Sequence, residues 1–97
     1  MGFENLVVMV GEISKIGEMN WTRKGTPVVN FKLTVKEKVG IKTIDTQIEC
    51  MAFGKDADFV SQIPIEGYEY YVKGKLRAGE RGLKLMIDSV QQLRVAS

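Results

Sequence analysis

Apolar and polar residues alternate along most of the chain with a period of two, which is typical of strands that face a core on one side. The alternation predicts four half-buried strands, over residues 27–36, 44–53, 68–77 and 83–88. In the third of these strands, the alternation favours the core side for Tyr68 and Tyr70. The pattern therefore indicates an all-β chain.

A further segment, at the start of the chain, breaks the alternation because all of its residues are apolar: Leu6, Val7, Val8, Met9 and Val10. One face of such a strand can enter the core, but the other face needs cover as well. Either a loop of the same chain or a second subunit could supply that cover. We favour a subunit interface, because a chain of 97 residues builds only a small core and gains stability by oligomerising.

Residues that favour turns stand where the alternation stops, at residues 23–27, at Val39–Gly40 and at residues 79–82. One short helix is predicted over residues 55–62, with acidic residues in its first turn and Pro64 after its end.

Five strands with one short helix between the third and the fourth give the element order of an oligonucleotide-binding (OB) barrel. We therefore predict an all-β, five-stranded OB-fold barrel. A single domain is expected over residues 1–97, with its core between about residues 6 and 93.

The chain contains no histidine and a single cysteine, Cys50. Ser-His-Asp or Cys-His catalysis, zinc-type metal sites and an intrachain disulfide are thereby excluded. The carboxylates of Asp45 and Glu49 show no paired arrangement for acid–base catalysis. We expect a binding protein that is not an enzyme, with no metal and no cofactor.

No apolar run approaches the ~20 residues of a membrane span. The first ten residues also lack the basic segment of a signal peptide. We therefore expect a cytoplasmic protein with no membrane partner, associated with the nucleoid if it binds DNA.

The net charge is only +2, but the basic residues are concentrated in two blocks. Residues 23–42 hold six basic residues and one acid, and residues 73–84 hold five basic residues and one acid. The segment between them, residues 45–69, holds six acids and one base. Two basic blocks on separate strands can form one patch for nucleic acid, although surface lysines can also simply solvate exposed strands.

Three segments resemble the bacterial single-stranded DNA-binding protein (SSB) family. They are residues 25–33, similar to G-T-x-V-x-N-F-x-L, residues 52–55, similar to A-F-G-K, and residues 71–76, similar to Y-V-E-G-x-L. A valine-rich first strand followed by Gly11, and the D-x-x-Q-x-L pattern of residues 88–93, also fit. The resemblance implies an OB fold, assembly through the first strand, and single strands bound on the outer face of the barrel.

Binding a single strand requires cations for the phosphates and flat rings for the bases. The candidate contact residues are Trp21, Arg23, Lys24, Lys32, Lys36, Phe53, Lys55, Tyr71, Lys73, Lys75, Arg77, Arg81 and Lys84. The resemblance implies that Phe53 stacks on a base, and its alternative role is local cover for the helix. Trp21 either stacks on a base or packs beneath its own loop. Tyr71 either joins the cations or lies beneath the first-strand interface.

Two features depart from the family pattern. The family's stacking tryptophans are replaced by Val39, Gln47 and Glu80, and the hairpin at residues 79–82 is short. Both changes predict weaker binding that relies on phosphate contacts and is sensitive to salt. The chain also ends at residue 97 without the family's linker and acidic tail. That ending resembles primosomal replication protein N (PriB), a compact phage or plasmid SSB, or a chain trimmed to its core.

The resemblance implies sequence-independent binding of single-stranded DNA in replication, recombination or repair. The expected binder is a homodimer or homotetramer that also contacts replication or repair proteins. One alternative is a PriB-like adaptor whose main partner is a helicase or another replication protein. Another is an OB barrel used only for protein interaction, because a fold does not fix a function.

Overall fold

The computed structural model describes residues 6–63 and 67–96, which contain six strands and one helix. The strands are β1 (Val7–Ser14), β2 (Asn20–Trp21), β3 (Pro27–Val39), β4 (Lys42–Phe53), β5 (Tyr68–Gly79) and β6 (Gly82–Val95). The helix α1 (Lys55–Gln62) lies between β4 and β5 and has the predicted bounds. Pro64, which was expected to end the helix, lies outside the described residues.

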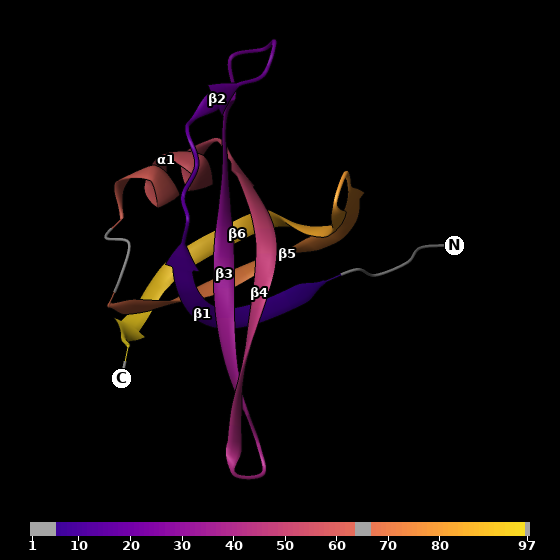
Figure 1. Cartoon of the computed structure of the whole chain (residues 1–97). Helices are drawn as coiled ribbons and strands as arrows, with labels where there is room; N and C mark the ends of the chain where they lie inside the picture. Colours follow the sequence, from indigo (N-terminus) through magenta and orange to yellow (C-terminus); the bar gives the residue numbers. More distant parts are fainter. Residues whose placement is uncertain (1–5, 64–66, 97) are drawn as a thin grey trace.

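Five of the strands close into a ring in the order β1-β5-β6-β4-β3, because β3 pairs back onto β1 (Figure 1). Neighbouring strands are antiparallel except β4 and β6, which pair in parallel through Cys50 with Leu85 and Met51 with Met86. This ring, with one helix between its third and fourth long strands, confirms the predicted OB fold.

The connection between the first two long strands contains a short strand that the sequence pattern did not predict. Asn20 and Trp21 of β2 pair with Val28 and Pro27 at the outer edge of β3. Two residues are too few to show an alternation, so the pattern predicts no strand at Trp21. The pairing instead holds the Trp21 backbone beside the start of β3.

Glycine allows the ring to close where β1 passes from one neighbour to the other. Residues 7–11 of β1 pair with β5, and residues 12–14 pair with β3. A Cβ atom on Gly11 would lie 2.3 Å from the carbonyl oxygen of Thr34. Any side chain at this position would therefore push β1 away from β3.

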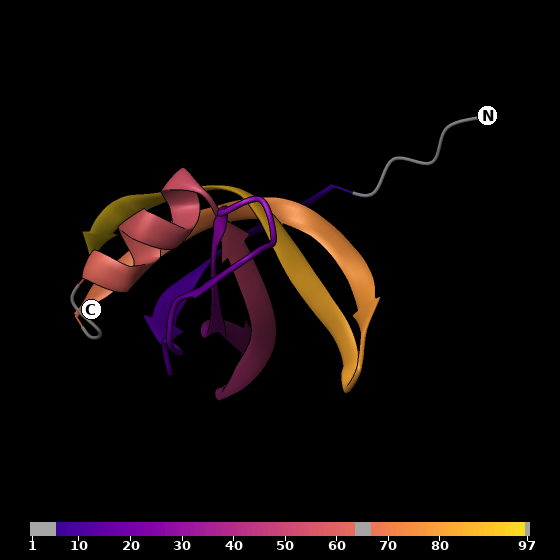
Figure 2. The ribbon, with the colours of Figure 1, turned by 90° about the horizontal axis from the view of Figure 1, so that it is seen from above.

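A second glycine shapes β5 where its pairing with β6 changes register. The shift falls between Lys73 and Gly74, and a Cβ atom on Gly74 would lie 2.2 Å from the carbonyl oxygen of Met86. This bend helps to turn the β5–β6 hairpin away from the side of the ring that carries α1 (Figure 2).

The interior of the ring is filled by aliphatic and aromatic side chains from every long strand and from α1. The fully buried members include Ile13, Val29, Leu33, Val60, Tyr70, Val72 and Leu85. Tyr70 is buried and Tyr68 packs partly buried against this core, as the alternation favoured. On α1, Ala57 and Val60 face the core, and Phe59 meets Tyr70 edge to face with ring centroids 6.3 Å apart.

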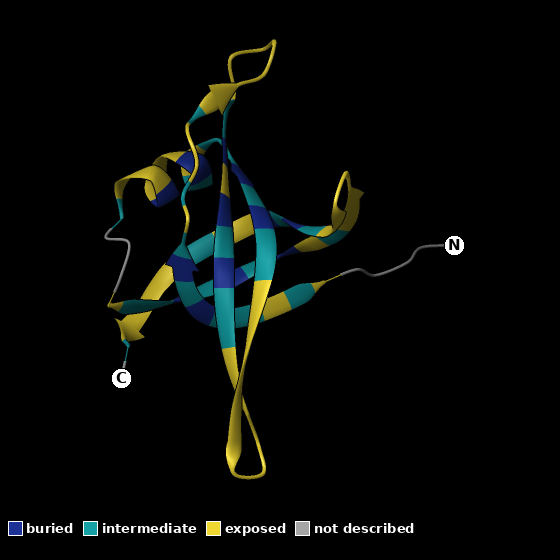
Figure 3. Ribbon diagram, viewed as in Figure 1, coloured by how far each residue is buried: buried dark blue, intermediate teal, exposed yellow. Residues whose placement is uncertain are grey.

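The β3–β4 ribbon extends beyond the barrel, which corrects the prediction of a half-buried strand starting at residue 44. Its ladder runs without a break from Val28 opposite Phe53 to Val39 opposite Lys42. No other described element packs on the far half of the ribbon, so residues 42–47 are exposed (Figure 3). The alternation identified the strand correctly, but it could not show where the core ends.

The tip of this ribbon is a two-residue turn at Gly40 and Ile41. The sequence had indicated a turn one position earlier, at Val39 and Gly40. Gly40 has a positive φ of 67°, as the first central residue of a tight hairpin turn requires. The turn at Glu80 and Arg81 between β5 and β6 agrees with the predicted hairpin at residues 79–82. Across the described parts of the chain, no helix has the length and apolar character needed to cross a membrane.

Candidate nucleic-acid interface

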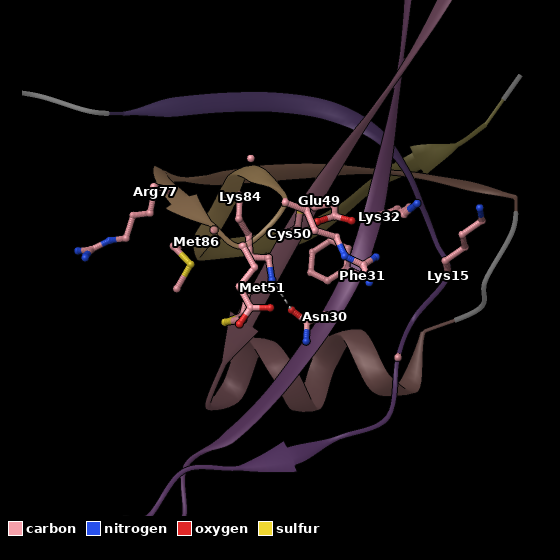
Figure 4. Close-up of a pocket in the computed structure, with 16 residues that line it drawn as sticks. Lys15, Asn30, Phe31, Lys32, Glu49, Cys50, Met51, Arg77, Lys84 and Met86 are labelled. Atoms are coloured by element: carbon pink, nitrogen blue, oxygen red, sulfur yellow. Dashed lines mark hydrogen bonds between the residues drawn. The ribbon is translucent and has the colours of Figure 1, made fainter.

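A groove of about 640 Å³ lies on the outer surface of the barrel, between the β3–β4 ribbon and the β5–β6 hairpin (Figure 4). One wall carries Asn30, Lys32, Glu49 and Met51 from β3 and β4. The other wall carries Arg77, Glu80, Arg81, Lys84 and Met86 from β5, β6 and their turn. Lys15, which follows β1 with a positive φ of 49°, closes one end. The groove therefore combines cations, acids and apolar side chains.

The β5–β6 wall holds positive charge that no acid on the opposing strand offsets. Arg77 stands directly opposite Lys84, and Lys75 stands opposite Met86. Like charges at directly opposed positions destabilise a strand pair, so this arrangement costs stability in the unbound protein. An anion lying between the two side chains would relieve that repulsion.

The β3–β4 wall is arranged in the opposite way. Lys32 stands opposite Glu49, and Lys36 stands opposite Asp45. Opposite charges at these cross-strand positions attract each other and partly cancel the positive potential at a distance. The lysines of β3 therefore offer less to a phosphate than their sequence alone indicated.

Besides the backbone pairing of β4 with β6, a hydrogen bond between side chains connects the two walls in the described part of the chain. The ammonium of Lys84 donates to Oδ1 of Asn30 over 3.2 Å, although 54 positions separate the two residues in the sequence. This contact lies above the parallel pairing of β4 with β6, where Met51 and Met86 are direct partners. Both methionines are half-buried and line the groove, so they give it an apolar floor.

The three aromatic candidates are not part of the groove lining. Phe53, half-buried, ends β4 opposite Val28. Trp21 is 64% exposed on β2, so it does not pack beneath its own loop. Tyr71 lies on β5 directly opposite Val10 of β1, which is the position beside the first strand that the sequence left as an alternative.

Four of the candidate contact residues meet in the groove: Lys32, Arg77, Arg81 and Lys84. The others are spread over the surface. Lys73 lies opposite Val8 of β1, Lys36 lies out along the ribbon, and Lys75 is exposed on β5 beside the groove. Arg23 and Lys24 belong to the exposed turn before β3, and Lys55 begins α1.

The lining residues that the sequence did not indicate include Lys15, Asn30, Glu49, Met51 and Met86. The alternation of β4 did place Glu49 and Met51 on the outer face. What it could not supply was the parallel pairing that brings Met86 beside Met51.

The thiol of Cys50 lies behind the groove wall, fully buried. Burial, a backbone hydrogen bond at Leu33 that acts the other way, and the nearby charge of Glu49 together raise its pKa from 9.0 to about 12. The thiol therefore stays protonated and unreactive at neutral pH. Among the described residues, no group of three or more acidic or cysteine side chains could hold a metal ion.

The closed five-stranded ring and the groove beside its β5–β6 hairpin define an OB-fold binding module with a basic wall and an apolar floor. The chain belongs to the single-strand binding protein family, whose family model matches residues 4–84.

Among curated proteins, the chain is similar to a single-stranded DNA-binding protein of Clostridium perfringens (strain 13 / Type A), with 33% identity over 76 residues. The match covers 77% of this chain and 50% of that protein, so the chain spans about half the length of this relative. Two solved structures of the protein PriB from Ralstonia solanacearum superpose with a TM-score of 0.81. Their sequences are 21% and 22% identical to this chain. The superpositions cover 93% and 94% of this chain, and 98% and 100% of the respective PriB chains, which shows a shared fold.

Proposed function

We propose that this protein binds single-stranded DNA in the groove between the β3–β4 ribbon and the β5–β6 hairpin, without requiring a particular sequence. The observation that carries the proposal is the β5–β6 wall, where Arg77 and Lys84 face each other without an acidic partner above the floor of Met51 and Met86. The membership of the single-strand binding protein family supports it. Replication, recombination and repair are the processes that expose such strands.

The division of the groove suits an unpaired strand. Phosphates would lie along the β5–β6 wall, near Arg77, Arg81 and Lys84. The faces of the bases would then contact the methionine floor, with Phe53 available at the edge. The proposed role is binding without catalysis, with the protein in the cytoplasm and associated with the nucleoid.

The proposal is tested by titrating fluorescent thymidine oligomers of increasing length at several salt concentrations. Three phosphate contacts predict that the logarithm of the binding constant falls with the logarithm of the salt concentration with a slope of about −2. Affinity should also rise with length until the groove is filled. Failure of a long oligomer to bind at low salt contradicts the proposal.

The two acids in the groove favour a second candidate, an adaptor that binds a protein partner more strongly than DNA. Glu49 and Glu80 both line the groove, and each would repel a phosphate. A replication or repair protein would be the partner of such an adaptor. The same titration separates the two roles, because an adaptor would bind the oligomers weakly at every length.

We also propose that two copies associate along β1. Leu6 and Val8 are 60% and 48% exposed, whereas Met9 packs against the core. Among the described strands, none pairs with the edge of residues 7–10 that faces away from β5. A second β1 would satisfy those backbone groups and bury the exposed side chains.

Sedimentation of Val8→Asp tests the association. The variant should be monomeric where the wild type is an oligomer, since a buried carboxylate without a partner opposes the contact. Ile41→Asp is the matched control, because Ile41 is an equally apolar, exposed side chain at the distant ribbon tip. A monomeric wild type, or the same mass for wild type and Val8→Asp, contradicts the proposed interface.

A further inference from the structure

Glu49 is a carboxylate in the middle of a groove for which we have proposed a polyanionic ligand. It lines the main groove and also a smaller adjoining hollow of about 490 Å³ that contains Gln47 and Leu83. The side chain is half-buried, and Figure 4 draws it among the lining residues beside Lys32. A ligand group that faces this carboxylate must be neutral or positively charged, or must donate a hydrogen bond to it.

The two walls differ in what they can accept from a single strand. The phosphates are attracted to the β5–β6 wall, where Arg77 and Lys84 carry unopposed positive charge. A strand held there would turn its bases towards the β3–β4 wall, across the floor of Met51 and Met86. On that wall Glu49 lies beside Asn30, Lys32 and Met51, and it is the acid among them, so it is the side chain that offers an ionised acceptor to the edge of a base.

The carboxylate is available for such a contact. In the described parts of the chain, the side chain of Glu49 makes no hydrogen bond and no ion pair, although Lys32 stands opposite it in the ladder. Both carboxylate oxygens can accept, and neither can donate while the group is ionised. Glu49 therefore selects for donors on the base edge.

Unpaired bases differ in what they present at their Watson–Crick edge. Cytosine and adenine carry exocyclic amino groups, and a carboxylate accepting from the cytosine amino group is an established form of base recognition. Thymine carries one N–H between two carbonyl oxygens, which a carboxylate repels. The chemistry of Glu49 thus separates amino-bearing bases from thymine.

We propose that the Glu49 carboxylate accepts a hydrogen bond from the exocyclic amino group of cytosine or adenine, so that the groove binds strands of these bases more tightly than thymidine strands. The inference rests on the proposed function, since it names which single strands the same groove prefers. The methionine floor contributes an apolar contact that is the same for every base. Preference for amino-bearing bases then depends on the Glu49 carboxylate.

The test compares cytidine and thymidine oligomers of equal length at the same salt concentration and at mildly alkaline pH, where cytosine is not protonated. The wild type should bind the cytidine oligomer about fivefold more tightly, as a partly solvated hydrogen bond to a charged group allows. Glu49→Gln should tighten binding to both oligomers by removing a negative charge, and it should reduce their ratio to about one.

Asp45→Asn is the matched control. Asp45 is also an acid on β4 opposite a lysine of β3, but it is exposed and lines neither hollow. This variant should strengthen both complexes slightly and keep the fivefold ratio. Equal wild-type affinity for the two oligomers, an unchanged ratio in Glu49→Gln, or the same loss of ratio in Asp45→Asn overturns the inference. If neither oligomer binds, it is the proposed function that fails.

Discussion

The β3–β4 ribbon and the β5–β6 hairpin are built alike but differ in how their charges are arranged. Each consists of two long antiparallel strands joined by a two-residue turn, and each supplies one wall of the groove. On the ribbon, Lys32 and Lys36 stand opposite acids, whereas on the hairpin Arg77 stands opposite Lys84. Cross-strand register, and not the number of basic residues, therefore decides which wall attracts phosphates.

The difference also concerns stability. Opposed charges of unlike sign stabilise a strand pair by about 0.2–1 kcal/mol, and like charges destabilise it by a similar amount. The ribbon therefore avoids the repulsion that the hairpin carries until an anion binds. The hairpin is therefore held in place by its backbone packing, in particular by the close contact of Gly74 with Met86.

Gly74→Ala should destabilise the protein by about 3 kcal/mol, because its Cβ atom would lie 2.2 Å from a backbone oxygen that cannot rotate away. The matched change in the ribbon is Gly40→Ala, where the added Cβ meets nothing within 4 Å and only the positive φ causes strain. That variant should lose about 1 kcal/mol. Urea unfolding of both measures the difference, and equal losses would mean that the hairpin does not depend on the close contact at Gly74.

Arg77→Gln combined with Lys84→Gln should weaken binding of single strands about 25-fold at about 0.1 M salt and make the salt slope shallower by about 1.4, as expected for two lost phosphate contacts. Lys36→Gln combined with Lys38→Gln is the control on the ribbon, because both residues are exposed and outside the groove. We expect less than about a threefold change there. The same slope for both pairs would remove the distinction between the two walls.

Much of the fold could be predicted because the signals were local. The alternation identified four of the five long strands, and an uninterrupted apolar run marked β1. The helix at residues 55–62 has the predicted bounds, and acidic residues mark its first turn. The extent of burial was not predictable in the same way. Ile44 alternates like a core residue but is 45% exposed, because this part of the ribbon extends beyond the barrel core.

The groove could not be predicted in this way, because contacts between segments distant in the sequence form it. A turn at Val39–Gly40 would have placed Lys32 opposite Gln47, and only the turn at Gly40 and Ile41 places it opposite Glu49. Because the predicted turn was one position too early, the sequence did not show that the lysines of β3 stand opposite acids of β4. The meeting of Met51 with Met86 has no local signal at all, because it follows from the closure of β4 onto β6.

Phe53→Ala should weaken binding by about 1.5 kcal/mol, or about tenfold, if the ring stacks on a base at the edge of the groove. Because stacking releases no counterions, the salt slope should stay unchanged, in contrast to the hairpin variants. Phe59→Ala is the matched control, since Phe59 is a partly exposed ring on α1 that contacts Tyr70. It should lower stability and leave affinity unaltered, and an unchanged affinity in Phe53→Ala would assign that ring to local packing.

The smallest effect concerns the seam that joins the ribbon to the hairpin, where Cys50 pairs with Leu85. Burial raises the pKa of the Cys50 thiol from 9.0 to about 12, so above pH 9 the unfolded chain releases this proton and the folded chain keeps it. Stability contributed by the protonated thiol is therefore complete below pH 9 and declines between pH 9 and about 12. One pH unit above 9, the wild type should have lost about 1.4 kcal/mol more than Cys50→Ala, measured by urea unfolding at each pH. Parallel pH profiles for the two proteins would mean that water reaches the thiol and that the seam between the two walls opens.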